Sequence, residues 1–362
     1  MQPKMDIQNR DSVSLGANIP PADPKLIVQT LPNEKTSLIS YAEAIREAIR
    51  EEMMRDKSVF IMGEDIAKHG GAFGVTRTLV DSFGNERVRN TPISENSIVG
   101  AGIGAAMTGM RPIIEIMFVD FSTLAMDQII NHAAKIPYMT GGQTKIPLVI
   151  RMPQGGGAGK AIAAQHSQSL EVLYAHIPGL TVVTPSTAYD AKGLLKAAIR
   201  YDNPVVFLEH KLLYNFKNQV PDTDYTIPLG VCDIKRTGTD LTIVANGYMV
   251  WISMQAAEIM HQEGVEIEVI DVMTVSPLDR QTITKSVRKT GRAVVVNESH
   301  TSYNAACEWG QTIQETVFDY LQAPIRRVTG RDTPVPYAYS LEKGQWPELA
   351  EVMTAVRETL AY

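Results

Sequence analysis

Short apolar runs alternate with segments of helical periodicity along most of this chain. In the first half the apolar runs are residues 59–62, 112–117, 147–152, 180–183 and 205–209. The helical patterns that follow them cover residues 97–108, 122–134 and 187–200. A strand that is apolar throughout is buried on both faces, which is typical of a parallel sheet with helices on both sides. We therefore predict an α/β fold built on parallel sheets.

The N-terminal segment lacks this alternation of apolar runs and helical patterns. Residues 1–36 contain five prolines and four acidic residues, with no apolar period. They have neither the apolar core of a signal peptide nor the acid-poor composition of an organelle transit peptide, so we predict a flexible N-terminal arm. Ser40 and Glu43 form a capping box before a helical apolar pattern, and we expect ordered structure to begin at Ser40.

A second alternation of strands and helices fills the C-terminal part. It runs through residues 241–245, 249–262, 266–272, 279–289, 293–297, 305–320 and 325–328. Asn, Asp and Pro are frequent between the two alternations, which is typical of a linker. A chain of 362 residues also favours two domains. We predict domains at 37–214 and 229–362, with the linker at 215–228.

Composition limits the classes of partner. The net charge of −6 gives no basis for binding nucleic acid or an anionic membrane surface. No uncharged run reaches the roughly 20 residues that a membrane-spanning helix needs. Cys232 and Cys307 are the only cysteines and lie far apart, so neither a disulfide framework nor a cysteine metal site is indicated. These features predict a cytoplasmic location.

His166 is the first candidate for chemistry. It lies between amides and hydroxyls in Ala164–Ser169, just after the glycine-rich segment 154–160. Imidazole gives or takes a proton near neutral pH, so a histidine behind a glycine loop is placed as an acid/base group would be. The alternative is an ordinary helix start with Ser167 or Ser169 as N-cap.

Glu95, Met117 and Phe121 are the other candidates. Glu95 opens a helix rich in glycine and alanine, where a carboxylate is also expected simply because it interacts well with the helix dipole. Those small residues allow another element to approach closely. Met117 and Phe121 follow a predicted strand, at the edge where open α/β sheets bind ligands. They suit a flat heterocycle, although both residue types are more often plain core.

Together these residues resemble a single family, the beta subunits of thiamine-diphosphate-dependent 2-oxoacid dehydrogenases, such as the pyruvate, branched-chain and acetoin dehydrogenases. The resemblance covers about residues 37–362. The segments that carry it are 91–95 (TPISE), 117–121 (MFVDF), 127–131 (DQIIN), 133–135 (AAK), 138–142 (YMTGG), 164–168 (AQHSQ), 178–180 (PGL), 190–195 (DAKGLL) and 202–204 (DNP).

The resemblance implies a pyrimidine-binding domain followed by a smaller transketolase C-terminal-like domain, in an alpha2beta2 assembly with thiamine diphosphate between alpha and beta. It implies that Glu95 hydrogen-bonds a pyrimidine nitrogen, that Phe121 stacks on the pyrimidine and that Met117 lines its edge. His166 would stabilise or protonate intermediates and assist acyl transfer to the lipoamide of an acyltransferase core.

The family's diphosphate and magnesium motif, Gly-Asp-Gly followed by Asn-Asn, is missing from this sequence. The resemblance therefore implies that the alpha subunit holds Mg²⁺ and that this chain alone is inactive. It also implies a potassium site formed by backbone carbonyls near Leu148, Ala198, Tyr201 and Asn203.

The substrate stays open at this point. Segments 59–65 and 276–279 are most similar to the acetoin and pyruvate branches. The loop before His166 and the segment 297–301 depart from the common pattern, which leaves a related enzyme of a specialised biosynthetic pathway as an alternative. A non-catalytic scaffold of the same fold is a second alternative. A self-sufficient transketolase-like enzyme is a third, and the missing motif disfavours it.

Overall fold

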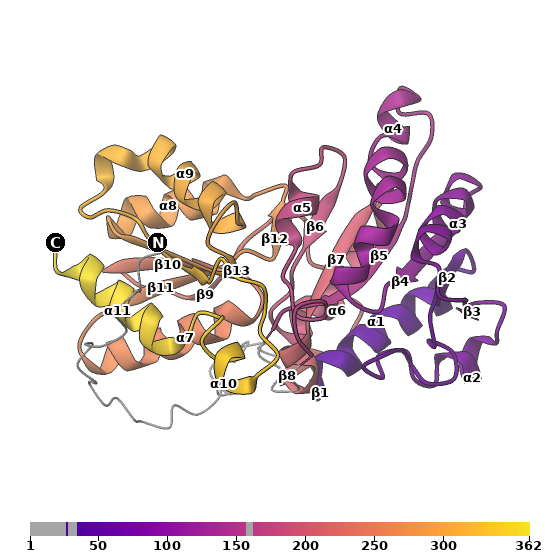
Figure 1. Cartoon of the computed structure of the whole chain (residues 1–362), viewed down its shortest axis with the longest axis horizontal. Coiled ribbons are helices and arrows are strands. Elements are labelled where there is room, and N and C mark those ends of the chain that lie inside the picture. The colour runs from indigo at the N-terminus through magenta and orange to yellow at the C-terminus, as the bar shows by residue number, and fades with distance from the viewer. Residues whose placement is uncertain (1–26, 28–34, 157–161) are drawn as a thin grey trace, which may run out of the picture.

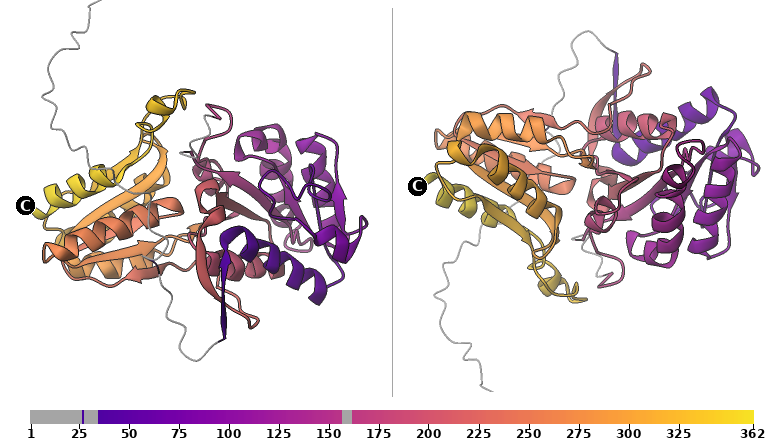
Figure 2. Two further views of the ribbon diagram at one scale, coloured as in Figure 1. Left: turned by 90° about the horizontal axis from the view of Figure 1, so that it is seen from below. Right: turned by 90° about the horizontal axis from the view of Figure 1, so that it is seen from above.

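The computed structural model describes residues 27, 35–156 and 162–362. Figure 1 shows two α/β units side by side, and Figure 2 shows the same pair from below and above. Within the described residues, the first unit is built on a seven-stranded sheet. In spatial order its strands are β12 (Thr274–Ser276), β6 (Thr181–Val183), β7 (Val205–His210), β5 (Val149–Gln154), β4 (Arg111–Glu115), β2 (Val59–Gly63) and β3 (Val88–Asn90).

The second unit has five strands among the described residues, in the order β14 (Arg326–Gly330), β13 (Ala293–His300), β10 (Leu241–Ala245), β11 (Ile267–Asp271) and β9 (Asp233–Arg236). Its helices are α7 (Tyr248–Gln262), α8 (Arg280–Thr290), α9 (Ala305–Val317), α10 (Tyr339–Glu342) and α11 (Leu349–Leu360), with a 3₁₀ turn at Phe318–Tyr320. None of the helices in the described part of the chain is long and apolar enough to cross a bilayer.

The α/β fold with parallel sheets is confirmed. All neighbouring strands of the two sheets pair in parallel except two edge strands, because β12 runs antiparallel to β6 and β9 antiparallel to β11. The sheets are therefore mixed at their edges. Strand β12 comes from the C-terminal part of the chain but completes the sheet of the first unit, so the two units share a sheet edge.

Two apolar cores lie on opposite faces of the sheets, because successive strand residues point to opposite sides. Ile113 packs in the core on the side of α1 (Tyr41–Arg55) and α6 (Ala188–Arg200), whereas Ile114 packs in the core on the side of α3 (Glu95–Met107). Each core continues from one unit into the other. This two-sided burial explains why the central strands are mostly apolar, and the charged residues among them, Glu115, Arg151 and Glu209, are buried as well.

Helix α1 begins as expected. Ser40 is its N-cap, and the capping box with Glu43 is present in both directions.

The helix expected at 122–134 is wrong, because a 3₁₀ helix (Val119–Ala125) and a π-helical turn (Gln128–Ala133) replace it. The Ser122 hydroxyl bonds to the Val119 carbonyl and to the Tyr174 hydroxyl, a local alternative to regular helix bonding. The shorter helices α2 (Leu79–Phe83), α4 (Ile136–Met139) and α5 (Glu171–Ala175) complete this unit.

The N-terminal arm, apart from Ile27, Lys35 and Thr36, lies outside the described residues. Ile27 is buried, and its carbonyl accepts a hydrogen bond from Asn218 (3.4 Å). Ordered structure starts before Ser40, since β1 (Thr36–Ser40) pairs antiparallel with β8 (Lys217–Pro221). The segment expected as a linker thus contains a strand, preceded by a 3₁₀ helix at Lys211–Asn215. The domain boundaries and the cytoplasmic location stay predictions.

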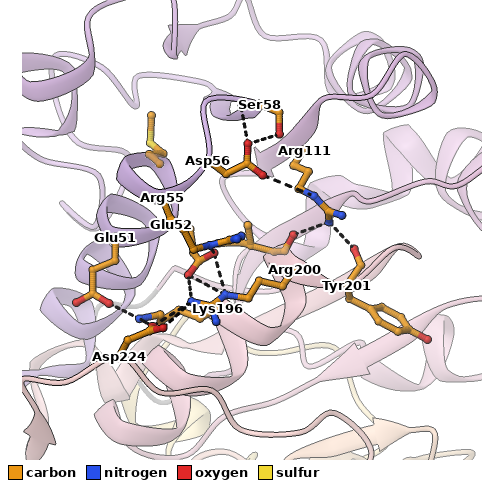
Figure 3. Close-up of polar contacts among 12 residues, drawn as sticks. Glu51, Glu52, Arg55, Asp56, Ser58, Arg111, Lys196, Arg200, Tyr201 and Asp224 are labelled. Carbon is orange, nitrogen blue, oxygen red and sulfur yellow. Dashed lines mark hydrogen bonds and ion pairs between the residues drawn. The ribbon is translucent and has the colours of Figure 1, made fainter.

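Helices α1 and α6 are joined by ion pairs as well as by apolar packing (Figure 3). The Glu52 carboxylate is fully buried and pairs with Arg55 (2.7 Å) and Arg200 (2.6 Å). The Lys196 ammonium, also buried, pairs with Glu51 and Asp224. These pairs fix the two helices against each other on the face of the sheet.

A second ionic cluster lies on the face of the sheet that also carries Ile113. The Arg151 guanidinium donates two hydrogen bonds to Glu209 (2.6 and 2.8 Å) and one to Glu115 (2.7 Å). All three side chains are at most 7% exposed. The two carboxylates outweigh the effect of burial and hold the pKa of Arg151 above its ordinary value, whereas burial raises the pKa of Glu115. The cluster joins the neighbouring strands β4, β5 and β7, with Glu115 and Glu209 at the carboxyl ends of β4 and β7 and Arg151 in the middle of β5.

We predict that Arg151→Met lowers the free energy of unfolding by about 3–5 kcal/mol, because two carboxylates stay buried without their cation. Denaturant unfolding of the chain measures the change. Arg280→Met is the control, since its pair with Glu308 is more than half exposed and is worth at most about 1 kcal/mol. Equal small losses in the two variants would show that the buried cluster contributes no more than a surface pair.

Candidate active site

A cleft of about 570 Å³ opens at the carboxyl edge of the first sheet. Its lining residues follow β2, β3 and β4 along the chain. They are Glu64, Asp65, Thr91, Pro92, Ile93, Glu95, Met117, Phe121 and Leu124. The structure therefore brings together Glu95, Met117 and Phe121, three of the residues singled out from the sequence. Carboxyl ends of parallel strands are where α/β sheets bind ligands.

Glu95 is the first residue of α3 and is 6% exposed. Its carboxylate thus lies where the helix dipole stabilises negative charge. The small residues of α3 allow this placement, because a Cβ on Gly102 would lie 2.8 Å from the side chain of Ile114 on β4. A Cβ on Gly104, in contrast, would meet no described residue outside the backbone of its own helix within 4 Å. The glycines therefore serve different purposes, and Gly102 lets α3 lie close against the sheet.

Two further polar groups in the cleft were not expected from the sequence. Glu64 follows β2, and partial burial, together with the carboxylates of Glu95 and Asp65, raises the pKa of Glu64. The Thr91 hydroxyl, which follows β3, is buried without a hydrogen-bond partner among the described residues. An orphaned buried hydroxyl in a cleft indicates a place where water or a ligand completes the bonding. Their only sequence signal is their position at strand ends.

The mouth of the cleft is apolar and open. Ile93 is 82% exposed and Leu124 is 63% exposed, and both side chains line the same cavity as Glu95. Two large aliphatic side chains at the entrance of a polar pocket form the kind of surface that a partner covers.

His166 lies beside this cleft. Its ring centroid is 5.1 Å from that of Phe121 and 4.9 Å from that of Phe118, in edge-to-face contacts. The 3₁₀ helix that replaces the expected regular helix positions Phe121 for this contact. The alternative of a capped helix start is wrong, because α5 begins only at Glu171, after Leu170 and without a side-chain cap. His166 thus joins the expected site through aromatic contacts.

Lys211 is another residue that the sequence did not indicate. Its ammonium donates to the His166 carbonyl and lies 5.4 Å from the centroid of the Phe118 ring. Burial lowers the pKa of Lys211 to about 8, despite the carboxylates of Asp120 and Glu298. The sequence signal that could have indicated Lys211 is its position directly after β7, at the edge of the sheet where ligands bind.

The residues expected around potassium lie elsewhere. Leu148 directly precedes β5, Ala198 lies in the last turn of α6, and Tyr201 and Asn203 lie between α6 and β7, so all four are near the amino ends of β5 and β7, at the opposite edge of the sheet. The Leu148 carbonyl accepts the N–H of Val205 (2.8 Å). The Tyr201 carbonyl accepts a hydrogen bond from a nearby guanidinium, that of Arg111 (3.1 Å; Figure 3). These residues do not take part in the cleft.

Comparison with known proteins shows which family the chain belongs to. Residues 37–217 match the family model of the transketolase pyrimidine-binding domain, and residues 230–352 match that of the transketolase C-terminal domain. A pyruvate dehydrogenase E1 component subunit beta of Rhizobium meliloti is 46% identical over 93% of this chain and 72% of its own length. The corresponding subunit of Rickettsia felis is 44% identical over 90% of this chain and 99% of its own length.

The 2-oxoisovalerate dehydrogenase subunit beta of Bacillus subtilis is 45% identical, over 89% of this chain and 98% of its own length. The chain belongs to the family of 2-oxoacid dehydrogenase beta subunits. A solved structure described as a split-gene transketolase, an inactive beta4 tetramer, superposes with a TM-score of 0.70 over 90% of this chain and 99% of that chain. At 21% identity it supports the fold alone.

The family expected from the sequence is thus confirmed, and with it thiamine diphosphate as the cofactor of this beta subunit. The cleft fits the pyrimidine end of that cofactor. It offers the buried carboxylate of Glu95 and the orphaned hydroxyl of Thr91 to ring nitrogens or an amino group, and Phe121 and Met117 to the flat ring.

We predict that Glu95→Gln lowers the pKa of Glu64, because it removes a neighbouring negative charge while leaving the burial of Glu64 in place. A pH titration of the labelled carboxyl group by NMR or infrared spectroscopy measures the shift. Glu86→Gln is the control, since Glu86 is almost fully exposed and outside the cleft. An unchanged or raised pKa in the Glu95 variant would contradict the proximity of the two groups.

Proposed function

We propose that this beta subunit supplies the pyrimidine-binding half of a thiamine-diphosphate site that an alpha subunit completes, in an enzyme that oxidatively decarboxylates pyruvate or another small 2-oxoacid. The observation that carries the proposal is the cleft at the carboxyl edge of the first sheet. It combines a buried carboxylate with an aromatic ring, and the exposed apolar side chains of Ile93 and Leu124 at its mouth form a surface that a partner subunit would cover.

In this proposal Glu95 holds a proton at a pyrimidine nitrogen. When bound, thiamine diphosphate supplies a carbon nucleophile for the 2-oxo group and a sink for the electrons released on decarboxylation. The carboxylate of Glu95 suits this role because it lies in the first turn of α3, where the helix dipole interacts favourably with an acidic side chain, and a carboxylate attracts a proton on a nitrogen that it faces. Phe121 and Met117, which line the same cleft, would pack against the flat ring and exclude water from it.

His166 acts on the substrate side in this proposal. Its edge-to-face contacts with Phe118 and Phe121 orient the imidazole, and its backbone is held through the ammonium of Lys211. An oriented imidazole delivers or removes a proton as the acyl group leaves for its acceptor. We propose lipoamide on an acyltransferase core as that acceptor.

The alpha subunit is expected to bring the diphosphate and Mg²⁺ site in an alpha2beta2 assembly, since this sequence lacks the Gly-Asp-Gly and Asn-Asn motif. We predict that the beta subunit alone does not decarboxylate, and that co-production with its alpha subunit gives 2-oxoacid-dependent dye reduction. Pyruvate, 2-oxoisovalerate and acetoin, tested side by side, identify the substrate. Full activity of the beta subunit alone would refute the composite site, and an inactive complex with every substrate would favour a scaffold.

Glu95→Gln is the matched variant for this experiment. We expect the assembled complex to form normally and to lose dye reduction by more than about 10²-fold, because the amide does not hold the proton that the carboxylate holds. Gel filtration checks assembly and dye reduction checks activity. Loss of assembly with this variant would indicate a structural role for Glu95 instead.

His166→Ala separates the two halves of the reaction. We expect acyl transfer to lipoamide to fall by about 10²-fold, the usual contribution of a positioned acid/base group, and dye-coupled decarboxylation to fall much less. Both rates are measured on the same complex with the same substrate. An unchanged rate of acyl transfer would contradict the assignment.

We also propose a potassium ion at the carbonyls of Leu148, Ala198, Tyr201 and Asn203, since backbone carbonyl oxygens suit this cation and a carbonyl that accepts one hydrogen bond keeps a second lone pair. A bound ion stabilises the folded state. Thermal unfolding of the complex should therefore move to lower temperature when sodium replaces potassium at equal ionic strength. Identical unfolding temperatures would exclude a potassium site of any consequence.

A further inference from the structure

We propose that the Glu298 carboxylate, together with His210, is a positioning group that fixes the loop carrying His166 from the second unit of the molecule. The inference rests on the proposed function of His166. It concerns how that residue is held in place, and Glu298 itself touches neither the cleft residues nor the imidazole of His166 in the contacts described below.

Glu298 lies on β13 and is 6% exposed. Its carboxylate reaches the carboxyl edge of the first sheet and accepts hydrogen bonds from the Gly156 N–H (2.7 Å) and the Ser169 hydroxyl (3.3 Å). It also contacts His210 Nε2 at 2.5 Å. These partners follow β5, precede α5 and end β7, respectively. One side chain of the second unit therefore binds three separate segments of the first.

The bonding of His210 fixes which group carries the proton. The N–H of Leu212 donates to Nδ1 of His210 (3.2 Å), so Nδ1 is an acceptor and Nε2 carries the hydrogen that it donates to Glu298. Although burial acts against the charged form, the His210 ring, the Gly156 N–H and the Lys211 ammonium together hold the pKa of Glu298 below its ordinary value. Glu298 is thus a charged acceptor at neutral pH.

The end of β5 is held so closely that only glycine fits. A Cβ on Gly155 would lie 2.1 Å from His210 Nε2, and a Cβ on Gly156 would lie 1.8 Å from the indole of Trp346. Gly155 also has a φ of +93°, which few other residues adopt. One ring comes from β7 and the other from the segment before α11, so the start of the loop is clamped between the two units.

The end of the loop is tied to the same place. The Ser299 hydroxyl donates to the Ser169 carbonyl (2.9 Å), and the Gly155 N–H donates to the Gln168 carbonyl (2.9 Å). His166 lies three residues before Ser169. Both ends of the segment that carries His166 therefore depend on the adjacent residues Glu298 and Ser299.

The two units do not need Glu298 to stay together. Lys235 of the second unit, itself buried, pairs with Asp190 of α6 (2.7 Å), and the Trp251 indole N–H donates to the Ser186 carbonyl (2.8 Å). These two contacts between the units involve none of the residues that Glu298 binds. The contacts of Glu298 are confined to the stem of the His166 loop and to the end of β7, which points to positioning rather than to general adhesion.

The test uses the complex with its alpha subunit and the two rates defined above for His166→Ala. We expect Glu298→Gln to lower acyl transfer to lipoamide by about tenfold, because a displacement of His166 of less than 1 Å suffices for such a loss, and to change dye reduction by no more than about twofold. In the double variant with His166→Ala, acyl transfer should fall no further than in His166→Ala alone, since both changes remove the same function.

Trp251→Phe is the control, because it weakens the boundary between the units away from the loop and should leave the ratio of the two rates unchanged. If Glu298→Gln does not fold, the double variant Ser169→Ala with Ser299→Ala replaces it. This variant removes two hydrogen bonds of the segment that carries His166 and leaves the Glu298 carboxylate its other partners. We again expect a loss of acyl transfer with little change in dye reduction. Equal loss of both rates, or multiplicative losses in the double variant, would overturn the proposal. If His166→Ala itself leaves acyl transfer unchanged, the proposed function of His166 fails first.

Discussion

The Arg151 guanidinium lies buried on one face of the first sheet, between the carboxylates of Glu115 and Glu209. Removing three charges from water is costly, and only mutual pairing with good geometry compensates for it. The pairing therefore requires β4, β5 and β7 to lie side by side in their observed register. The chain segments that leave these strand ends carry Met117, the glycine pair before the His166 loop, and Lys211. The site depends on this alignment.

The site is built in two steps from that edge. The strand ends and the first turn of α3 form a cleft in which Glu95, Phe121 and Met117 face the same space. The second unit then fixes the loop of His166 through Glu298 on β13. The apolar residues at the mouth remain exposed, which agrees with a family whose beta subunits work beside an alpha subunit. The packing of the two units and the segment that carries His166 are thus connected through short polar contacts.

Much of this architecture follows from local sequence patterns. Mostly apolar runs identified the central strands because burial on both faces leaves no regular polar alternation, and the capping box located the start of α1. The candidates Glu95, Met117 and Phe121 were found because they sit where strands end or a helix begins. The cleft confirms that they lie together, while their roles stay proposals.

Other features depend on contacts that local patterns do not encode. Strand β12 joins the sheet of the other unit, and β8 is polar in part, so neither has the signature of a buried parallel strand. The 3₁₀ helix around Phe121 arises from hydroxyl bonds of Ser122 with a distant tyrosine. Likewise, Glu298 reaches Gly156 across 142 positions of sequence, a distance at which no spacing rule operates.

The central claim is that this chain provides the pyrimidine half of a shared cofactor site. A structure of the assembled alpha–beta complex with thiamine diphosphate tests it most directly. We predict a pyrimidine ring nitrogen within about 2.7–3.2 Å of the Glu95 carboxylate, with the ring against Phe121 and Met117. A cofactor whose pyrimidine lies entirely within the alpha subunit, or away from this cleft, would contradict the account.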